Sequence, residues 1–438
     1  MINNSNPVQY RITQILAGIM AITIGICIYS CAGVSNTTVN SKVDKMINTR
    51  FIEFEKRLDS LIGPAERQIA VDELIADVKT CGGPIIEDDS TVVFLYQGDD
   101  DTVSITGDMN EWVNSIPMEK ISGTNLFFLR LKIEPDARIE YWLLPQSETF
   151  FATDKFNLFQ VWNGFGPVSE LAMPGYQRHP YFDDFKYGKK WNPATLDMFE
   201  MPTGVLDYSR QIHVYLPPGY EEDSGDYPSL YVQDGLDYVE FAIVPGILDR
   251  LIADKLIEPL VAVFVTPPNR HLPEMPNRMT EYGLNDDYVS FMCEELVPEI
   301  SQRYRTEDKA TSRLVVGDSY GGLISVYAGF KRPDIFGLVY GQSGYYSFQE
   351  DTLIKQIAQA DTQPVRYYID VGEYEHQVGA DLLPAGETDF LAANRRLKII
   401  LKDKGYDFIY REYPEGHTWG NWRRHLIDVL IHFFGTGE

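Results

Sequence analysis

Three patterns of hydrophobic and polar positions follow one another along the chain. From Lys45 to Lys79 apolar residues recur at helical spacing, and Gly63-Pro64 interrupts the run, which predicts two helices. Residues 85–170 carry short β-rich runs separated by Asp, Asn and Gly, which predicts a β-sandwich of immunoglobulin-like size. From about Ile212 strand-like and helical stretches alternate, which predicts a mostly parallel sheet covered on both faces.

These patterns place the individual elements. The sandwich strands are expected at Thr91 to Tyr96, Thr102 to Thr106, Leu126 to Ile133 and Arg138 to Leu144. The strands of the C-terminal sheet are expected at Ile212 to Leu216, Leu230 to Gln233, Leu260 to Val265, Leu314 to Val316, Leu338 to Gly341, Tyr367 to Val371 and Phe408 to Tyr413. The helices between them are expected at Phe241 to Ile252, Tyr288 to Ile300, Leu323 to Phe330, Phe390 to Lys402 and Trp422 to Phe434.

Changes of composition divide the chain into segments. They are a signal segment at 1–31, a polar tether with the helical lead-in at 32–84, the sandwich at 85–170, a linker rich in Pro, Tyr, Phe and Asp at 171–205, and the C-terminal α/β domain at 206–438. At 438 residues the chain is long enough for two domains with a core each.

The signal segment has a positive start at Arg11 and an apolar run from Ile12 to Tyr29. The following Ile28 to Gly33 resembles a bacterial lipobox, in which Cys31 is lipidated. The alternative is an uncleaved transmembrane anchor, because the run approaches the length of a spanning helix. Either interpretation places the folded part outside the cytoplasm. Lipidation predicts a protein of the bacterial cell envelope, anchored to a membrane on its periplasmic face or in the outer membrane.

Charge and cysteine usage narrow the possible partners. The formal net charge is −26, from 38 Lys+Arg against 64 Asp+Glu. A surface this acidic repels phosphate backbones, so nucleic acid is not expected as a partner. The four cysteines are too scattered for a metal site, so no metal is expected; they are Cys27, Cys31, Cys81 and Cys293.

The stretch Arg313 to Phe336 carries the main candidate for chemistry. A β-branched run leads into Gly317-Asp318-Ser319-Tyr320-Gly321-Gly322, and an apolar helix follows. Strand, sharp turn and helix are the context of the G-x-S-x-G nucleophile elbow, whose serine hydroxyl is exposed at the start of the helix. The alternative is a glycine-rich turn whose serine only caps that helix. The elbow predicts that Ser319 is a nucleophile and that the C-terminal domain has the α/β-hydrolase fold.

A serine nucleophile needs a base and an acid that orients the base. In α/β-hydrolases the chain order is serine, acid, histidine. His417 is the candidate base, because it lies in the loop between the last expected strand and the final helix. The acid should follow the strand ending at Val371, where Glu375 is the first choice and Asp370 the reserve.

The developing oxyanion needs two backbone N–H donors. The residue after the nucleophile, Tyr320, should supply one. The loop after the strand ending at Gln233 should supply the other, from Gly235 or Leu236.

The turn Gly107 to Trp112 resembles the G-D-F-N-x-W turn of early-set sandwich domains. The resemblance covers about six residues, so it supports the sandwich fold rather than a ligand. Trp112 is expected to pack under the turn.

The landmarks of the C-terminal domain together resemble the enterochelin esterase-like branch of a broad esterase family, a branch similar to esterase D and to feruloyl esterase modules. They are Gln233 to Gly235, Asn277 to Tyr282, Gly317 to Gly322, Pro333 to Gly337, Gln342 to Gly344, Gly372 to Glu375 and Gly416 to Arg423. Upstream, Gly82 to Glu87 resembles the segment that opens the sandwich in that branch. The resemblance implies carboxylic ester hydrolysis through an acyl-serine, with no metal or organic cofactor.

Three further residues of these landmarks are candidates for substrate contact. Arg278 and Glu281 could bind a substrate carboxylate or hydroxyl, or could form a structural ion pair, which is the preferred interpretation. Trp419 follows the candidate base by two positions.

The predicted function is that of an envelope-anchored serine carboxylesterase acting on a small-molecule or glycan ester. Enterochelin esterases proper act on a ferric tri-catechol lactone in the cytoplasm, and this acidic, exported chain departs from them there. The alternatives are a feruloyl or acetyl esterase acting on an acylated polysaccharide, an acyltransferase with the same triad, and a non-catalytic binding protein.

Overall fold

The structure is a computed structural model. It describes residues 50–148, 151–164, 166–179, 196–268, 277–379 and 388–437, so the expected signal segment, Cys31 and much of the expected linker lie outside the described residues. The chain divides into two compact units, residues 1–177 with 414–416, and residues 178–413 with 417–438. The division at Gln177 falls within the stretch predicted as the linker. No helix within the described ranges is both long and apolar enough to cross a membrane.

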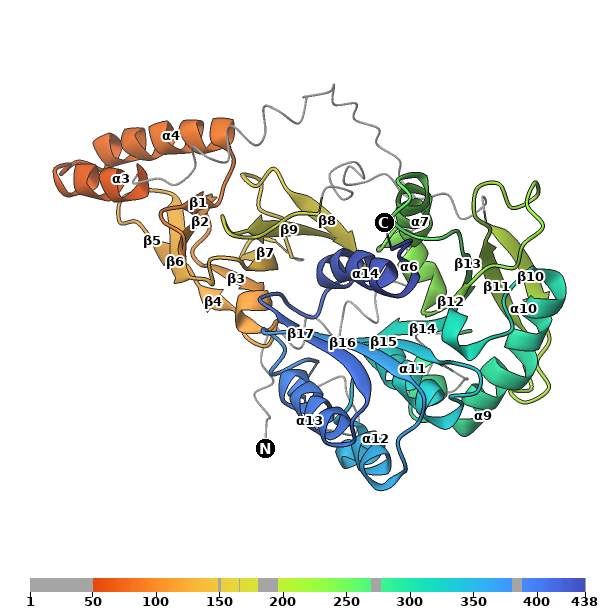
Figure 1. The fold of residues 1–438 in the computed structure, drawn as a ribbon. Coiled ribbons are helices and arrows are strands. Elements are labelled where there is room, and N and C mark those ends of the chain that lie inside the picture. Colours follow the sequence, from red (N-terminus) through yellow and green to blue (C-terminus); the bar gives the residue numbers. More distant parts are fainter. Residues whose placement is uncertain are drawn as a thin grey trace. The chain divides into compact units, whose positions relative to one another are not determined.

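The first unit begins with two helices, α3 (Arg50–Asp59) and α4 (Pro64–Cys81), as the helical spacing predicts. Pro64 occupies the first turn of α4, where its missing N–H costs no hydrogen bond. Phe51 and Phe54 of α3 and Val71 of α4 are buried in one cluster with strand residues of the neighbouring sheet. The two helices therefore cover one face of that sheet (Figure 1).

Two antiparallel sheets make up the predicted sandwich. One has the order β1-β2-β6-β5 and is formed by β1 (Ile85–Ile86), β2 (Thr91–Gln97), β5 (Glu119–Lys120) and β6 (Leu126–Lys132). The other has the order β4-β3-β7-β9-β8 and is formed by β3 (Val103–Gly107), β4 (Ile116–Pro117), β7 (Arg138–Pro145), β8 (Gln160–Asn163) and β9 (Gly166–Ala172). The rings of Phe94 on β2 and Tyr141 on β7 pack edge to face with centroids 4.9 Å apart, which joins the two sheets.

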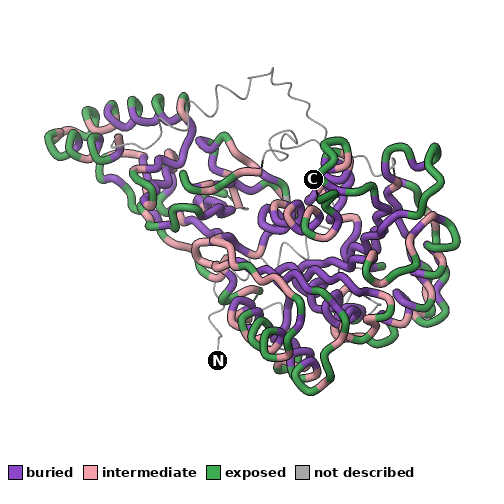
Figure 2. Tube along the Cα trace, viewed as in Figure 1, coloured by how far each residue is buried: buried purple, intermediate pink, exposed green. Residues whose placement is uncertain are grey.

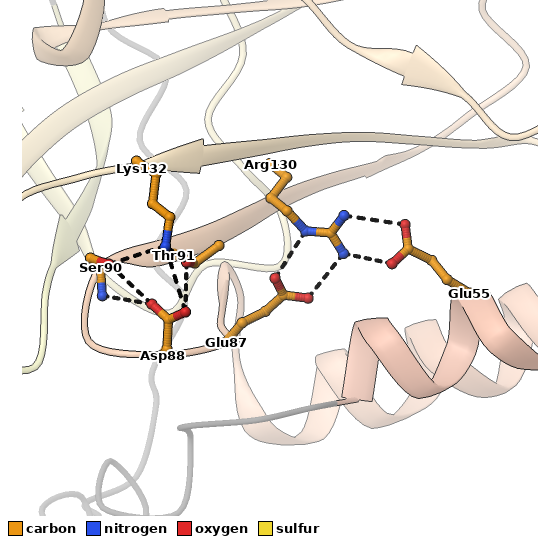
Figure 3. A network of polar contacts seen from close by, with 7 residues as sticks. All are labelled: Glu55, Glu87, Asp88, Ser90, Thr91, Arg130 and Lys132. Carbon is orange, nitrogen blue, oxygen red and sulfur yellow. Dashed lines mark hydrogen bonds and ion pairs between the residues drawn. The ribbon is translucent and has the colours of Figure 1, made fainter.

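A polar network on the surface of this unit ties helix α3 to the sheet (Figure 3). The Nε atom of Arg130 donates to Glu87, and its Nη2 atom donates to Oε2 of Glu55 on α3, at 2.9 and 2.6 Å. Lys132 contacts Ser90, Thr91 and Asp88 in the same region. These charges are partly exposed, so the network contributes less than the buried aromatic contacts beneath it.

The second unit contains an eight-stranded sheet of order β10-β11-β13-β12-β14-β15-β16-β17. Its strands are β10 (Asp197–Met201), β11 (Arg210–Tyr215), β12 (Ser229–Gln233), β13 (Val261–Val265), β14 (Arg313–Asp318), β15 (Leu338–Gln342), β16 (Arg366–Gly372) and β17 (Asp407–Tyr413). The pairs β10–β11 and β11–β13 are antiparallel, and the remaining pairs are parallel. Parallel strands end at the same edge of a sheet, so the loops after β12, β14, β15, β16 and β17 meet at one edge.

Helices cover both faces of this sheet, and its central strands are buried (Figures 1 and 2). Successive strand residues alternate between two apolar clusters: Val315 belongs to one, and Leu314 and Val316 belong to the other. One cluster packs against α10 (Val297–Arg303), α11 (Tyr320–Lys331), α12 (Phe348–Gln359) and α13 (Phe390–Asp403). The other packs against α6 (Gly235–Glu240), α7 (Val244–Ala253) and α14 (Trp419–Phe434).

The structure differs from the predicted elements at several places. The expected helix Tyr288 to Ile300 is three pieces, α9 (Asp286–Ser290), a π-helical segment (Phe291–Leu296) and α10. Strands β8, β9 and β10 and helix α12 were not predicted. Each is short or carries polar residues that obscure the periodic spacing of its apolar residues. The fold class nevertheless agrees with the prediction in both units.

Candidate active site

Ser319 lies at a strained turn between β14 and α11. Its backbone has φ 56° and ψ −115°, a conformation that side-chain-bearing residues adopt rarely and that the surrounding structure must hold. The Ser319 N–H donates to the carbonyl of Gln342 on β15, and its carbonyl accepts from Leu323 and Tyr345. A Cβ atom on Gly317 would lie 2.5 Å from the backbone of Gly321, so the turn can close only with glycine there. Residues 317–321 therefore have the backbone geometry of the predicted elbow, with Ser319 at its centre.

His417 and Glu375 form a hydrogen-bonded pair at the same sheet edge. His417 lies in the loop between β17 and α14, and its Nδ1 atom lies 2.9 Å from Oε2 of Glu375. Glu375 is fully buried in the loop after β16. A buried carboxylate at Nδ1 fixes the tautomer that leaves Nε2 free to accept a proton, which is the arrangement a general base requires.

The structure separates the two candidate acids. Asp370 is buried on β16, and its Oδ2 atom accepts from the hydroxyl of Tyr340. Glu375 contacts His417 directly, so the first choice fits the role of the acid and the reserve does not.

The loop after β12 approaches the elbow and offers one free amide. The Asp234 N–H donates to the Tyr282 hydroxyl at 3.0 Å, and the Leu236 N–H donates to Oγ1 of Thr266 at 3.1 Å. No partner is recorded within the described chain for the N–H of Gly235 or of Tyr320. Of the two alternatives for the second oxyanion donor, Gly235 is therefore the better one. A Cβ on Gly235 would lie 2.5 Å from the backbone of Phe264, which explains the glycine.

Arg278 links the two loops that carry these amides. Its Nε atom donates to both carboxylate oxygens of Asp234 at 2.8 Å, and Nη2 donates to the carbonyl of Asp318 at 3.0 Å. Burial alone would lower the pKa of Arg278, but the charges of Asp234 and Asp318 raise it above the usual value. The side chain is 20% exposed. Arg278 thus has a structural role, while part of its side chain remains accessible.

Glu281 and Trp419 lie inside the protein. Oε1 of Glu281 accepts hydrogen bonds from Arg210 and Tyr208, and its carboxylate is buried. This geometry supports the preferred interpretation of Glu281, which is a structural role. Trp419 is also buried, with its ring packed against Tyr238 at 5.1 Å, so neither side chain presents itself as a substrate contact.

Aromatic side chains run from the elbow to the base. Tyr320 packs on Tyr345 with ring centroids 5.0 Å apart, and Tyr345 stacks on Phe390 at 4.9 Å. Phe390 in turn meets the His417 ring edge to face at 5.2 Å. Burial raises the pKa of Tyr320 to about 12, so its hydroxyl is protonated at neutral pH.

Two residues that the sequence analysis did not single out complete the surroundings of the acid. Ser343 donates to Oε1 of Glu375 at 2.6 Å, and Nε1 of Trp422 donates to Oγ of Ser343 at 3.0 Å. Both lie within landmarks of the family resemblance, which was the signal that could have identified them. In the part of the chain that the structure describes, no group of His, Cys, Asp and Glu is arranged to hold a metal ion.

Comparison with known proteins identifies esterases among the proteins similar to this chain. A model of the family described as "Putative esterase" matches residues 203–433. The iron(III) enterobactin esterase of Escherichia coli O6:H1 is 24% identical over 362 residues, which cover 75% of this chain and 85% of that protein. An endo-1,4-beta-xylanase/feruloyl esterase of Xylanibacter ruminicola is 26% identical over 177 residues, 35% of this chain and 22% of that protein.

Among solved structures, the enterobactin esterase of Shigella flexneri, determined in the presence of enterobactin, has a TM-score of 0.63. The superposition covers 78% of this chain and 92% of that chain, at 20% identity. That likeness concerns the fold, which is the predicted α/β-hydrolase with a β-rich N-terminal region. The match to the family model covers more than half of the chain, so the protein belongs to this esterase family and is a carboxylic ester hydrolase.

Proposed function

We propose that the protein is a serine esterase that cleaves its substrate through an acyl-serine at Ser319. The observation that carries the proposal is the buried Glu375 hydrogen-bonded to Nδ1 of His417, at the sheet edge where the elbow holds Ser319. A base oriented in this way, next to a serine on a strained turn, is the arrangement that activates a hydroxyl.

The steps follow from these positions. Nε2 of His417 takes the Ser319 proton as Oγ attacks the ester carbonyl, and the N–H groups of Tyr320 and Gly235 stabilise the oxyanion. The imidazolium then gives the proton to the departing alcohol, which leaves the acyl-serine. Water, deprotonated by His417, attacks the acyl-serine, and the imidazolium returns that proton to Oγ of Ser319 as the acid is released. Glu375 stays ionised throughout and stabilises the imidazolium.

The proposed substrate is an ester of an aromatic acid. The name of the feruloyl esterase relative supports this class, because ferulic acid is an aromatic acid. The partly exposed side chain of Arg278 is the proposed contact for a substrate carboxylate or hydroxyl.

A second candidate is the deacylation of a plant polysaccharide, as in the feruloyl esterase relative. We also propose lipidation at Cys31 and a place in the bacterial cell envelope, on the support of the lipobox-like sequence alone. An exported enzyme would meet polysaccharide esters more readily than an intracellular one does.

The experiment that tests these proposals uses the chain from Thr37 onward. It is incubated with a ferric tri-catechol lactone, a feruloylated arabinoxylan fragment and an acetylated xylan, and the products are followed by mass spectrometry. The S319A variant is the matched control. We expect cleavage of an aromatic ester by the wild-type chain and none by S319A. Full activity of a folded S319A variant would refute the serine mechanism, and cleavage of acetylated xylan alone would refute the aromatic substrate class.

The same reaction with trehalose or glucose added separates hydrolysis from acyl transfer. Hydrolysis predicts the free acid as product, whereas an acyltransferase would give a sugar ester.

A further inference from the structure

A serine and a tryptophan extend the hydrogen-bonded pair of Glu375 and His417. Oε1 of the carboxylate accepts from the Ser343 hydroxyl at 2.6 Å and from the Gly372 N–H at 2.8 Å. Oε2 faces Nδ1 of His417 at 2.9 Å. The Ser343 hydroxyl accepts in turn from Nε1 of Trp422 at 3.0 Å. These four side chains form one continuous line of hydrogen bonds from the Trp422 indole to the His417 imidazole.

The indole gives this line a direction. An indole N–H is a donor only, so the Ser343 oxygen must accept from it. The single proton of the Ser343 hydroxyl is then directed to the Glu375 carboxylate. A hydroxyl without such a partner could rotate, but this one has a fixed orientation, and donation to a carboxylate favours its ionised form.

The position of Ser343 is itself held by the backbone. Ser343 has φ 46° and is fully buried, and its N–H donates to the carbonyl of Asp370 at 2.8 Å. The Trp422 ring also contacts the His417 ring edge to face, with centroids 4.9 Å apart. One indole therefore packs against the base and orients the hydroxyl that contacts the acid.

We infer that Ser343 and Trp422 are positioning residues for the reaction. They hold the buried Glu375 carboxylate in one orientation, so that it can keep His417 in the productive tautomer. The inference rests on the proposed serine mechanism. It assigns to the Ser343 hydroxyl a role that acts through Glu375 and involves no contact with substrate.

The inference predicts a specific change in the pH profile. Donors to the carboxylate favour the unprotonated state of the Glu375–His417 pair, so removing one makes the pair take up its proton more readily. The acidic limb of kcat/KM should therefore move to higher pH. Other titratable groups on the elements around the pair are the same in every variant; they are Asp370, Glu373, His376, Asp389, Arg423 and His425.

The test compares three variants in the hydrolysis of phenyl acetate between pH 5 and pH 9. S343G removes the hydroxyl and tolerates the positive φ. W422F keeps an aromatic ring but removes the N–H. S229A is the matched control, because the Ser229 hydroxyl is equally buried and has no recorded partner within the described chain.

We expect S343G to lower kcat about tenfold to a hundredfold, with KM changed less than about twofold. Its acidic limb should move upward by about 0.5 pH unit or more, W422F should show a smaller shift of the same sign, and S229A should show none. Soluble, folded S343G with an unmoved limb would overturn the inference, whether or not its kcat had fallen. The S319A variant is assayed in parallel. Retained activity of S319A would show that the serine mechanism fails, which is a different outcome from an unmoved acidic limb in S343G.

Discussion

Each of the two units buries an arginine among carboxylates, and the two clusters are built differently. In the sandwich unit Arg138 pairs with Glu140 and Glu170 at 2.8 and 2.6 Å, and its side chain is 3% exposed. In the esterase unit Arg278 pairs with Asp234 and Asp318, and its side chain is 20% exposed. The first cluster lies along strands β7 and β9, whereas the second joins two loops beyond the carboxyl ends of strands.

This difference separates a structural cluster from one at a reaction site. The partners of Arg138 project from paired strands, so the sheet fixes all three charges and closes them off from water. Burial, followed by the charge of Glu140, raises the pKa of nearby Asp108 to about 8, which shows how little solvent reaches this region. Asp234 follows β12 and Asp318 ends β14, so the partners of Arg278 meet at the proposed active site, where a substrate needs room.

The largest expected effect on stability comes from removing the buried cation of Arg138. The R138M variant should lose about 3–5 kcal/mol of unfolding free energy, because it leaves buried carboxylates without their cation. Urea unfolding measures the loss. The turnover of the remaining folded molecules should change little. An unfolding free energy within about 1 kcal/mol of the wild-type value would mean that water reaches the carboxylates of Glu140 and Glu170.

A change at Arg278 should affect catalysis more than stability. A lysine presents one compact ammonium in place of a planar fork, so R278K cannot bridge Asp234 and Asp318 in the same way. We expect kcat to fall about tenfold to a hundredfold, which corresponds to about 1.4–2.7 kcal/mol of transition-state stabilisation. Separate kcat and KM values provide the check. A rise in KM with kcat unchanged would mean that Arg278 acts only as the proposed substrate contact, and that its bridge between Asp234 and Asp318 does not matter for turnover.

Asp154 provides a pH-dependent comparison within the sandwich unit. Burial raises the pKa of this carboxyl to about 6, and it accepts from Tyr141 and from the Phe156 N–H. A raised acid pKa means that the folded state binds more protons between about pH 4 and 6, so stability falls as pH rises through that window.

The D154N variant removes that titration. The stability advantage of the wild type over D154N should shrink by about 2 kcal/mol between pH 4 and pH 7. Urea unfolding of both proteins at the two pH values tests this, and a constant difference would show that Asp154 does not titrate as expected.

The smallest effect is expected at the surface. Arg130 forms ion pairs with Glu55 and Glu87, but its side chain is 34% exposed, so water and salt screen the interaction. We expect R130Q to lose about 1 kcal/mol or less, and less still in 1 M salt. A loss as large as that of R138M would remove the distinction between exposed and buried pairs.

The sequence was most informative where function depends on local backbone. The elbow could be recognised because a strained turn at Ser319 demands glycines at fixed offsets, and the same argument holds for the loop at Gly235. The bounds of buried strands such as β12 and β13 also followed from their uninterrupted apolar runs.

Tertiary partners decided what the sequence left open. From the sequence, Leu236 and Gly235 were equal candidates for the oxyanion donor. In the structure the Leu236 N–H donates to Thr266, which lies in the loop after another strand. Asp370 and Glu375 were separable only by the direction in which each carboxylate points. The burial of Trp419 depends on Tyr238 and Trp422, residues from two different helices.

The crowding at Gly317 has a consequence for anyone who redesigns this enzyme. Because no side chain fits between that residue and Gly321, random libraries that include the elbow would consist largely of unfolded members. New specificities must therefore be sought by varying the surrounding loops, with the reactive turn kept constant as a transplantable module.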